Sequence, residues 1–235
     1  MWDPVLDRLA AERDVLALDL PGFGGSPPVD GGAPAALAGA VGEWLRSQGL
    51  DRPHLAGNSL GGWVALELAL SGGAASVTAI APAGLWPEPL LPKRGMARMV
   101  ARALLPVLGP LMRWPAARRL ALAGSAAHPD RIPAADARRL VCAYATAPGF
   151  DAANAAMRAG RFTALADITV PVTLGWPEYD RLVAVPRRLP AGVRSFDLPG
   201  CGHLPTWDDP ELVARLLLDG SAVWIMQAWR SRPNA

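Results

Sequence analysis

The sequence has few of the residues that build disulfide-rich, zinc-binding or nucleic-acid-binding proteins. Its 235 residues include only two cysteines, Cys142 and Cys201, too few for a disulfide framework or a zinc cluster. The formal net charge of +2 is too small for the basic field that nucleic-acid-binding proteins carry. Lys93 is the only lysine, an imbalance that indicates coding bias rather than function. We therefore expect no metal, no cofactor and no nucleic-acid partner.

Long apolar runs are also missing. The longest ones are interrupted by Glu67 and by Pro106 and Pro110, short of the roughly 20 apolar residues that a spanning helix needs. The first residues, 1–4, lack the basic and then apolar order of a signal peptide. We expect no stable membrane insertion and a cytoplasmic location. Because 51% of the residues are hydrophobic, the chain can build a buried core.

Short apolar runs typical of strands alternate with stretches of helical periodicity. The expected strands are residues 14–20, 53–58, 76–81, 170–176 and 194–198, and the expected helices are residues 2–12, 34–48, 60–70 and 210–218. This alternation predicts an α/β fold with a mostly parallel sheet flanked by helices.

Residues 84–163 break the alternation, because they contain many alanines, arginines and prolines and no convincing strand. We interpret them as a helical insertion that divides the core into residues 1–83 and residues 164–235. Within it, residues 93–102 carry basic side chains on one side and apolar ones on the other. We expect a helix with a solvated basic face, and a helix lying on a membrane surface is the alternative.

The segment Gly57-Asn58-Ser59-Leu60-Gly61 has the pattern G-x-S-x-G between an expected strand and an expected helix. Such a turn lifts the serine above the sheet, and its two glycines remove side chains that would collide. The backbone N–H of Leu60, at the start of the helix, is then placed to stabilise an oxyanion. Ser59 is the candidate nucleophile, and the alternative is a glycine-rich turn whose serine has no chemical role.

A serine nucleophile needs a base, and the chain has three histidines. His54 lies inside the strand before the serine and is expected to pack in the core. His128 falls in the insertion and is expected to be a loop residue. His203 follows an expected strand in the glycine-flanked loop 200–203, which can project an imidazole over the edge of the sheet. His203 is therefore the candidate base.

The candidate acid is Asp180, just past the carboxyl end of an expected strand. The order Ser59, Asp180, His203 is the nucleophile, acid and base order of one known arrangement of such triads. The other carboxylates nearby are expected to be misplaced, surface or helix-capping residues: Glu178, Asp197, Asp208 and Asp209.

With these motifs in hand, the chain resembles the α/β-hydrolase fold superfamily over nearly its whole length. The loop at residues 19–26, the nucleophile turn at 57–62, the acid loop at 176–180 and the histidine loop at 200–203 carry the resemblance. It implies that residues 84–163 form a helical cap above the site. Possible pocket-lining residues are Leu85, Trp86, Met96, Met99 and Trp114.

One departure from the family concerns the start of the chain. The family's first three strands, and the His-Gly motif whose following residues donate the second oxyanion N–H, are not present before residues 2–12. The third of those strands normally lies between the strands expected at 14–20 and 53–58. We therefore expect either a gapped sheet or a strand pairing that the family does not use, in an N-terminally shortened hydrolase: a misplaced start, a fragment or a decayed gene. Losing one oxyanion donor lowers turnover by about 10²–10³.

These residues favour a serine hydrolase that cleaves carboxylic esters or related acyl bonds of small apolar substrates. A hydrolase of carbon–carbon bonds in ring-cleavage products, with the same triad, is one alternative, and Asn58 resembles that group. A truncated remnant without catalysis is the other. Haloalkane dehalogenases and epoxide hydrolases are disfavoured because their nucleophile is an aspartate, where this chain has Ser59. The sequence gives no indication of an oligomeric state.

Overall fold

The computed structural model describes residues 1–91 and 95–222 and contains a four-stranded, all-parallel sheet. Its strands are β1 (His54–Asn58), β2 (Ser76–Ile80), β3 (Val172–Pro177) and β4 (Arg194–Leu198), in the order β1-β2-β3-β4. Because every pairing is parallel, all four carboxyl ends meet at one edge. The predicted α/β class is confirmed.

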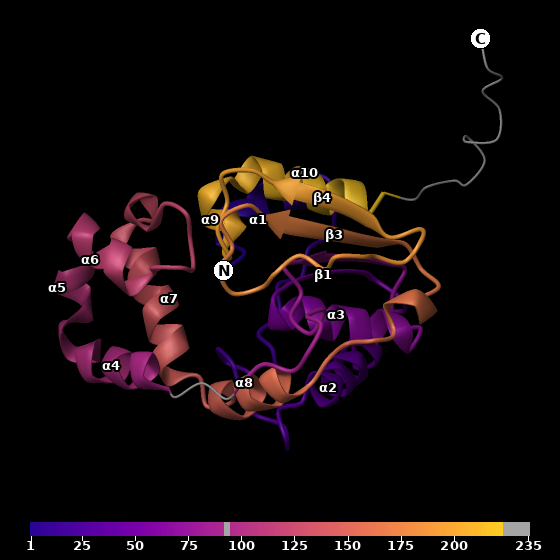
Figure 1. Ribbon diagram of the computed structural model, residues 1–235, viewed down its shortest axis with the longest axis horizontal. Coiled ribbons are helices and arrows are strands. Elements are labelled where there is room, and N and C mark those ends of the chain that lie inside the picture. The colour runs from indigo at the N-terminus through magenta and orange to yellow at the C-terminus, as the bar shows by residue number, and fades with distance from the viewer. Residues whose placement is uncertain (92–94, 223–235) are drawn as a thin grey trace, which may run out of the picture.

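Helices cover both faces of the sheet (Figure 1). On one face α3 (Leu60–Leu70) packs against β1 and β2, and α2 (Pro34–Ser47) covers α3. On the other face α10 (Pro210–Gly220) packs against β2 and β3, with α1 (Asp3–Ala10) beside it. The short helix α9 (Pro205–Asp208) leads into α10.

Burial follows this layering. All five residues of β2 are buried, as a strand covered on both faces requires. Leu66 of α3 and Leu174 of β3 are fully buried on one side of the sheet. Ile80 and Val213 are fully buried on the other. The carboxyl-end loops are thus anchored to a rigid scaffold.

Residues 14–20 do not form the predicted strand. Leu16 and Leu18 in this run are 61% and 39% exposed. A strand needs a neighbour for its backbone hydrogen bonds, and among the described strands β1 pairs only with β2. Within the described residues the sheet therefore ends at β1, and no strand lies beyond it to leave a gap.

The amino-terminal half of β1 is correspondingly open. His54 and Ala56 are exposed, whereas Gly57 and Asn58 are buried. The expectation that His54 packs in the core is wrong, because no described strand lies on the side of β1 away from β2. The His54 Nδ1 atom lies 2.8 Å from Ser76 Oγ, and the partial burial of the imidazole lowers the pKa of His54.

Between β2 and β3 the described chain forms helices and turns but no further strand of the sheet. The five α-helices are α4 (Met96–Leu104), α5 (Leu108–Met112), α6 (Pro115–Ala121), α7 (Ala134–Thr146) and α8 (Phe150–Ala159). Helices α4 to α7 lie to one side of the sheet and α8 lies next to α2 (Figure 1). The insertion has its own apolar cluster around Leu108, Ile132 and Ala137. The proposed domain boundaries at 84 and 163 stay a prediction.

Helix α4 differs from what was expected for residues 93–102, because it buries a basic side chain and exposes two apolar ones. Residues 93 and 94 lie outside the described chain. Arg98 is only 2% exposed, pairs with Asp151 and lies 5.0 Å from the centre of the Phe150 ring. Met96 and Met99 are instead 65% and 66% exposed. The expectation of a solvated basic face is wrong for Arg98, whose buried guanidinium joins α4 to the start of α8, whereas Arg102 is exposed. In the described residues no helix is both long and apolar enough to cross a membrane.

Candidate active site

Ser59 lies in the sharp turn between β1 and α3, with φ 54° and ψ −116°. This left-handed backbone conformation is strained for a residue with a side chain and is concentrated at functional sites. Its N–H donates to the Ile80 carbonyl over 2.9 Å, which fixes the turn against β2. A Cβ at Gly57 would lie 2.1 Å from the Gly61 carbonyl oxygen, so the first glycine is required. A Cβ at Gly61 would meet open space, so the expected collision there is wrong.

Ser59 Oγ has no hydrogen-bond partner in the part of the chain that the structure describes. The next residue, Leu60, begins α3, and the first N–H groups of a helix have no acceptor within the helix. A hydroxyl and helix N-terminal amides therefore lie together at this point, where the helix dipole favours negative charge.

His203 and Asp180 form a buried pair at the same edge of the sheet. His203 Nδ1 lies 2.7 Å from Asp180 Oδ2, and the two side chains are 9% and 2% exposed. Asp180 Oδ1 accepts hydrogen bonds from the backbone N–H of Leu182 and Val183 at 2.7 and 3.1 Å. The carboxylate is thus held in place by its own loop, and it orients the imidazole through Nδ1.

Asn58 connects the nucleophile turn to the histidine loop. Its side-chain nitrogen Nδ2 donates to the His203 carbonyl at 3.1 Å and to the Ile80 carbonyl at 3.2 Å. The side chain is buried, so both bonds lie away from water. The turn that carries Ser59 is thereby joined to the loop that carries His203. Sequence reasoning gave Asn58 no such role, although a buried amide at the end of an apolar strand was an available signal.

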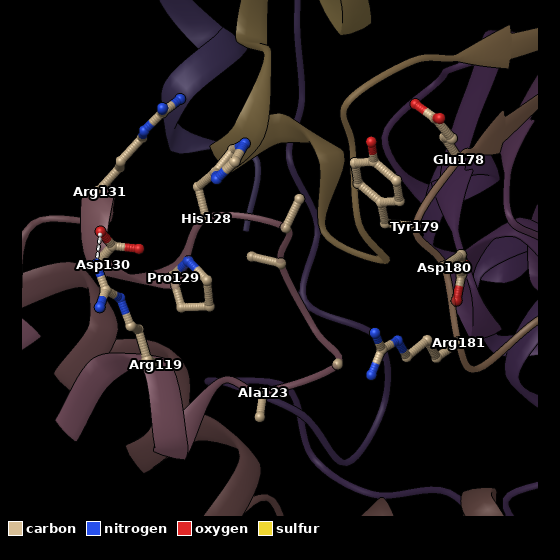
Figure 2. Close-up of a pocket in the computed structure, with 13 residues that line it drawn as sticks. Arg119, Ala123, His128, Pro129, Asp130, Arg131, Glu178, Tyr179, Asp180 and Arg181 are labelled. Carbon is tan, nitrogen blue, oxygen red and sulfur yellow. Dashed lines mark hydrogen bonds and ion pairs between the residues drawn. The ribbon is translucent and has the colours of Figure 1, made fainter. Parts of the chain in front are cut away.

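A cavity of about 790 Å³ lies between the insertion and the acid loop. Figure 2 shows side chains of residues 119–131 on one side and of residues 178–181 on the other. Asp180 is among the lining residues and Arg181 points into the space. Across it, Arg119 pairs with Asp130 at 2.9 Å. The lining is therefore largely polar and charged.

Comparison with known proteins identifies the family of this chain. The sequence model described as "Alpha/beta hydrolase family" matches residues 1–216, which is most of the chain. The chain belongs to the alpha/beta hydrolase family. The superfamily resemblance seen in the four motifs is confirmed.

Individual relatives of this hydrolase cover several activities. It is 34% identical over 197 residues to epoxide hydrolase EphH of Mycobacterium tuberculosis, with 78% of this chain and 92% of the relative aligned. A bacterial membrane phospholipase A has a TM-score of 0.68 and 28% identity, covering 93% of this chain and 75% of that one. A thermophilic esterase from Thermogutta terrifontis has a TM-score of 0.68 and 21% identity, covering 93% and 83%. The last similarity shows the fold alone.

The predicted pocket-lining residues of the hydrolase are not gathered at one place. Leu85 and Trp86 line a second, smaller cavity of about 250 Å³, and Trp86 is buried in the main core with its Nε1 donating to the Gly160 carbonyl. Met96, Met99 and Trp114 are 65%, 66% and 70% exposed. None of the five lines the larger cavity, and their role in substrate binding stays a prediction.

Other polar residues near the site have identifiable structural partners. Glu178, the competing acid, accepts a hydrogen bond from the Gly200 N–H at 2.8 Å and so braces the histidine loop. His128 lines the larger cavity. Burial raises the pKa of the Cys201 thiol to about 12, so this thiol is neutral and unreactive at ordinary pH. Among the described residues, no group of three or more histidine, cysteine or acidic side chains could hold a metal ion.

Proposed function

We propose that this hydrolase cleaves carboxylic esters or related acyl bonds, with Ser59 as nucleophile, His203 as base and Asp180 as the orienting acid. The observation that carries the proposal is the buried 2.7 Å contact between His203 and Asp180, next to a strained serine turn. The bond from Asn58 to the His203 carbonyl supports it, because it joins the turn to the histidine loop.

In the proposed mechanism, Ser59 Oγ attacks the substrate carbonyl carbon while His203 Nε2 takes the hydroxyl proton. The resulting tetrahedral oxyanion accepts a hydrogen bond from the Leu60 N–H, where α3 begins. His203 then gives the proton to the leaving alcohol, and the acyl group stays on Ser59. A water molecule, deprotonated by His203, hydrolyses this ester and restores the serine. Asp180 stabilises the imidazolium in both halves of the cycle.

For the substrate, we propose a small acyl compound that needs no cofactor or macromolecular partner. The cavity of about 790 Å³ is lined by Asp180, whereas Ser59 and His203 are not among its lining residues. The sequence favoured an apolar substrate. A substrate that extends from Ser59 into this cavity would meet arginine, histidine, tyrosine and carboxylate side chains, which favours an ester with one polar or charged group.

Two other reactions compete with ester cleavage. Epoxide hydrolysis is favoured by the activity for which the 34% identical relative is named, and in this chain it would have to proceed without an aspartate at the nucleophile position. Carbon–carbon bond hydrolysis would use the same three residues. A chain without catalysis would instead leave all three substrate classes unchanged.

The test is a parallel kinetic assay of the folded chain with a short-chain nitrophenyl ester, a ring-cleavage diketone and an aryl epoxide. We expect kcat/KM to be highest for the ester and to fall by about 10⁴–10⁶ in Ser59→Ala. Ser47→Ala is the matched control, since Ser47 is exposed at the end of α2 and its Oγ bonds only within that helix end, donating to the Trp44 carbonyl and accepting from Gln48 Nε2. An ester rate that survives in Ser59→Ala would refute the mechanism.

A further inference from the structure

Asp208, at the end of α9, accepts three backbone hydrogen bonds through one side chain. Its Oδ1 accepts from the His128 N–H at 2.9 Å. Its Oδ2 accepts from the Ala127 N–H at 2.9 Å and from the Gly202 N–H at 2.8 Å. Hydrogen bonds to an ionised carboxylate are roughly twice as strong as neutral ones, so this is a firm anchor.

The three donors belong to two different parts of the molecule. Ala127 and His128 lie in the insertion, in the loop that lines the larger cavity. Gly202 immediately precedes His203. One carboxylate therefore joins the cavity wall to the loop that carries the candidate base. Leu204, on the other side of His203, donates its N–H to the Ser125 carbonyl at 2.6 Å, so the histidine is held from both sides.

The two backbones at this junction are in close contact. A Cβ at Gly202 would lie 2.6 Å from the Ala127 nitrogen and 2.7 Å from the Ala126 carbonyl carbon. The two backbones touch because this position is glycine. Trp207, next to Asp208, packs against the apolar cluster of the insertion. The contact is thus a built junction of backbone, carboxylate and aromatic ring.

We propose that Asp208 is a positioning residue, which holds the His203 loop against the cavity wall so that the imidazole stays on Asp180. This inference rests on the proposed function, in which His203 is the base. Asp208 does not touch the reacting atoms, and its effect passes through the backbone on either side of the junction. A 1 Å displacement of a catalytic group lowers rates by about 100-fold.

The neighbouring carboxylate provides a matched control. Asp209 accepts from the Leu212 N–H at 2.9 Å and so caps the start of α10. Asp208→Ala and Asp209→Ala each remove one carboxylate from adjacent positions. Both are expected to lower the Tm, since both delete hydrogen bonds that the fold uses. Only the first is expected to move His203.

The experiment measures the rate at which a fluorophosphonate labels each variant, well below its Tm. We expect Asp208→Ala to be labelled about 10- to 100-fold more slowly than wild type, and Asp209→Ala at the wild-type rate. Asp208→Asn, which keeps one acceptor oxygen, is expected to fall between them. Wild-type labelling of Asp208→Ala, or an equal loss in Asp209→Ala, would overturn the proposal.

A second readout does not depend on activity. Proton NMR detects the Nδ1–H of His203 as a downfield resonance while it is bound to Asp180, assigned by its loss in His203→Asn. We expect this resonance to disappear or broaden in Asp208→Ala and to persist in Asp209→Ala. If wild type is not labelled at all, the proposed function fails, and the resonance alone decides: its loss in Asp208→Ala supports the positioning role and its persistence overturns it.

Discussion

The two edges of the sheet position their functional residues differently. Towards the β4 edge, the loops that follow β3 and β4 carry Asp180 and His203, which hydrogen bonds hold together, although β4 itself is exposed at residues 195–197. On the other side, residues 14–20 are apolar enough for a strand but lie exposed, and β1 is half-open. The same kind of sequence gives a strand only where a neighbouring strand completes its hydrogen bonds.

The contrast extends to the site. The acid and the base follow β3 and β4, and hydrogen bonds to their own loops position them. The nucleophile follows the half-open strand, and it is held through its strained backbone and through Asn58. Positioning of Ser59 therefore depends on β1 being fixed from one side, by β2 and α3.

The largest effect is expected from changing the candidate acid, Asp180, in the loop after β3. Asp180→Asn leaves the shape of the side chain but removes the charge that orients the His203 imidazole, and kcat is expected to fall by about 10⁴. Glu178→Gln is the control, because Glu178 binds only the Gly200 N–H and is expected to change kcat far less. Ester hydrolysis kinetics measure both. Equal losses in the two variants would show that the contrast between these carboxylates is wrong.

The next prediction compares a buried leucine of β3 with an exposed leucine of residues 14–20. Leu174→Ala in β3 deletes a fully buried side chain and is expected to lower the free energy of unfolding by about 2–5 kcal/mol. Leu16→Ala, at a position 61% exposed, is expected to change it by within about 0.5 kcal/mol. Urea denaturation gives both values. A large loss in Leu16→Ala would mean that residues 14–20 are packed as a strand in solution.

How much of this was available from the sequence depends on the kind of interaction. Local patterns and chain order predict the core strands and the helices around them. They also predict the pair His203–Asp180, because each of these residues lies in a loop just after a strand. The failure of 14–20 to form a strand depends on which strand lies beside it. The buried Arg98 depends on contacts with α8, over fifty residues away. Periodicity within one segment carries no such information.

Asp208 illustrates the same limit within the candidate site. From sequence it was a surface or capping residue, and its neighbour Asp209 does cap a helix. Nothing local distinguishes the two. The three donors that give Asp208 its role include two that lie about eighty residues earlier in the chain, in the insertion. Chain order located the three proposed catalytic residues, but it could not reveal this junction.

A smaller effect tests the strain on the nucleophile side. Ser59→Gly removes the Cβ that makes φ 54° unfavourable, and we expect the free energy of unfolding to rise by about 1 kcal/mol after the added flexibility of the unfolded chain is subtracted. Ser59→Ala keeps the Cβ and is expected to gain nothing. Urea denaturation of the two variants distinguishes them, and a destabilised Ser59→Gly would argue against strain at this turn.

A further prediction, confined to alkaline pH, concerns Cys201 beside the histidine loop. Its thiol has a pKa of about 12 in the folded chain, above the ordinary value of 9.0, so folding favours the neutral thiol. This contribution to stability is complete below pH 9 and is lost as the pH rises from 9 towards 12. Cys201→Ala is expected to lose stability less steeply than wild type over that range. Thiol titration at pH 8 should modify the half-buried Cys142 and leave Cys201 unreacted.

We propose above that Ser59, His203 and Asp180 act as one catalytic unit, although the serine follows β1 and the other two residues follow β4 and β3. The most direct measurement is mass spectrometry of the chain after treatment with a fluorophosphonate. We expect one covalent adduct, on the peptide that contains Ser59, and we expect it to form much more slowly in His203→Asn than in wild type. Labelling at another residue, or labelling of Ser59 at an unchanged rate in His203→Asn, would contradict it.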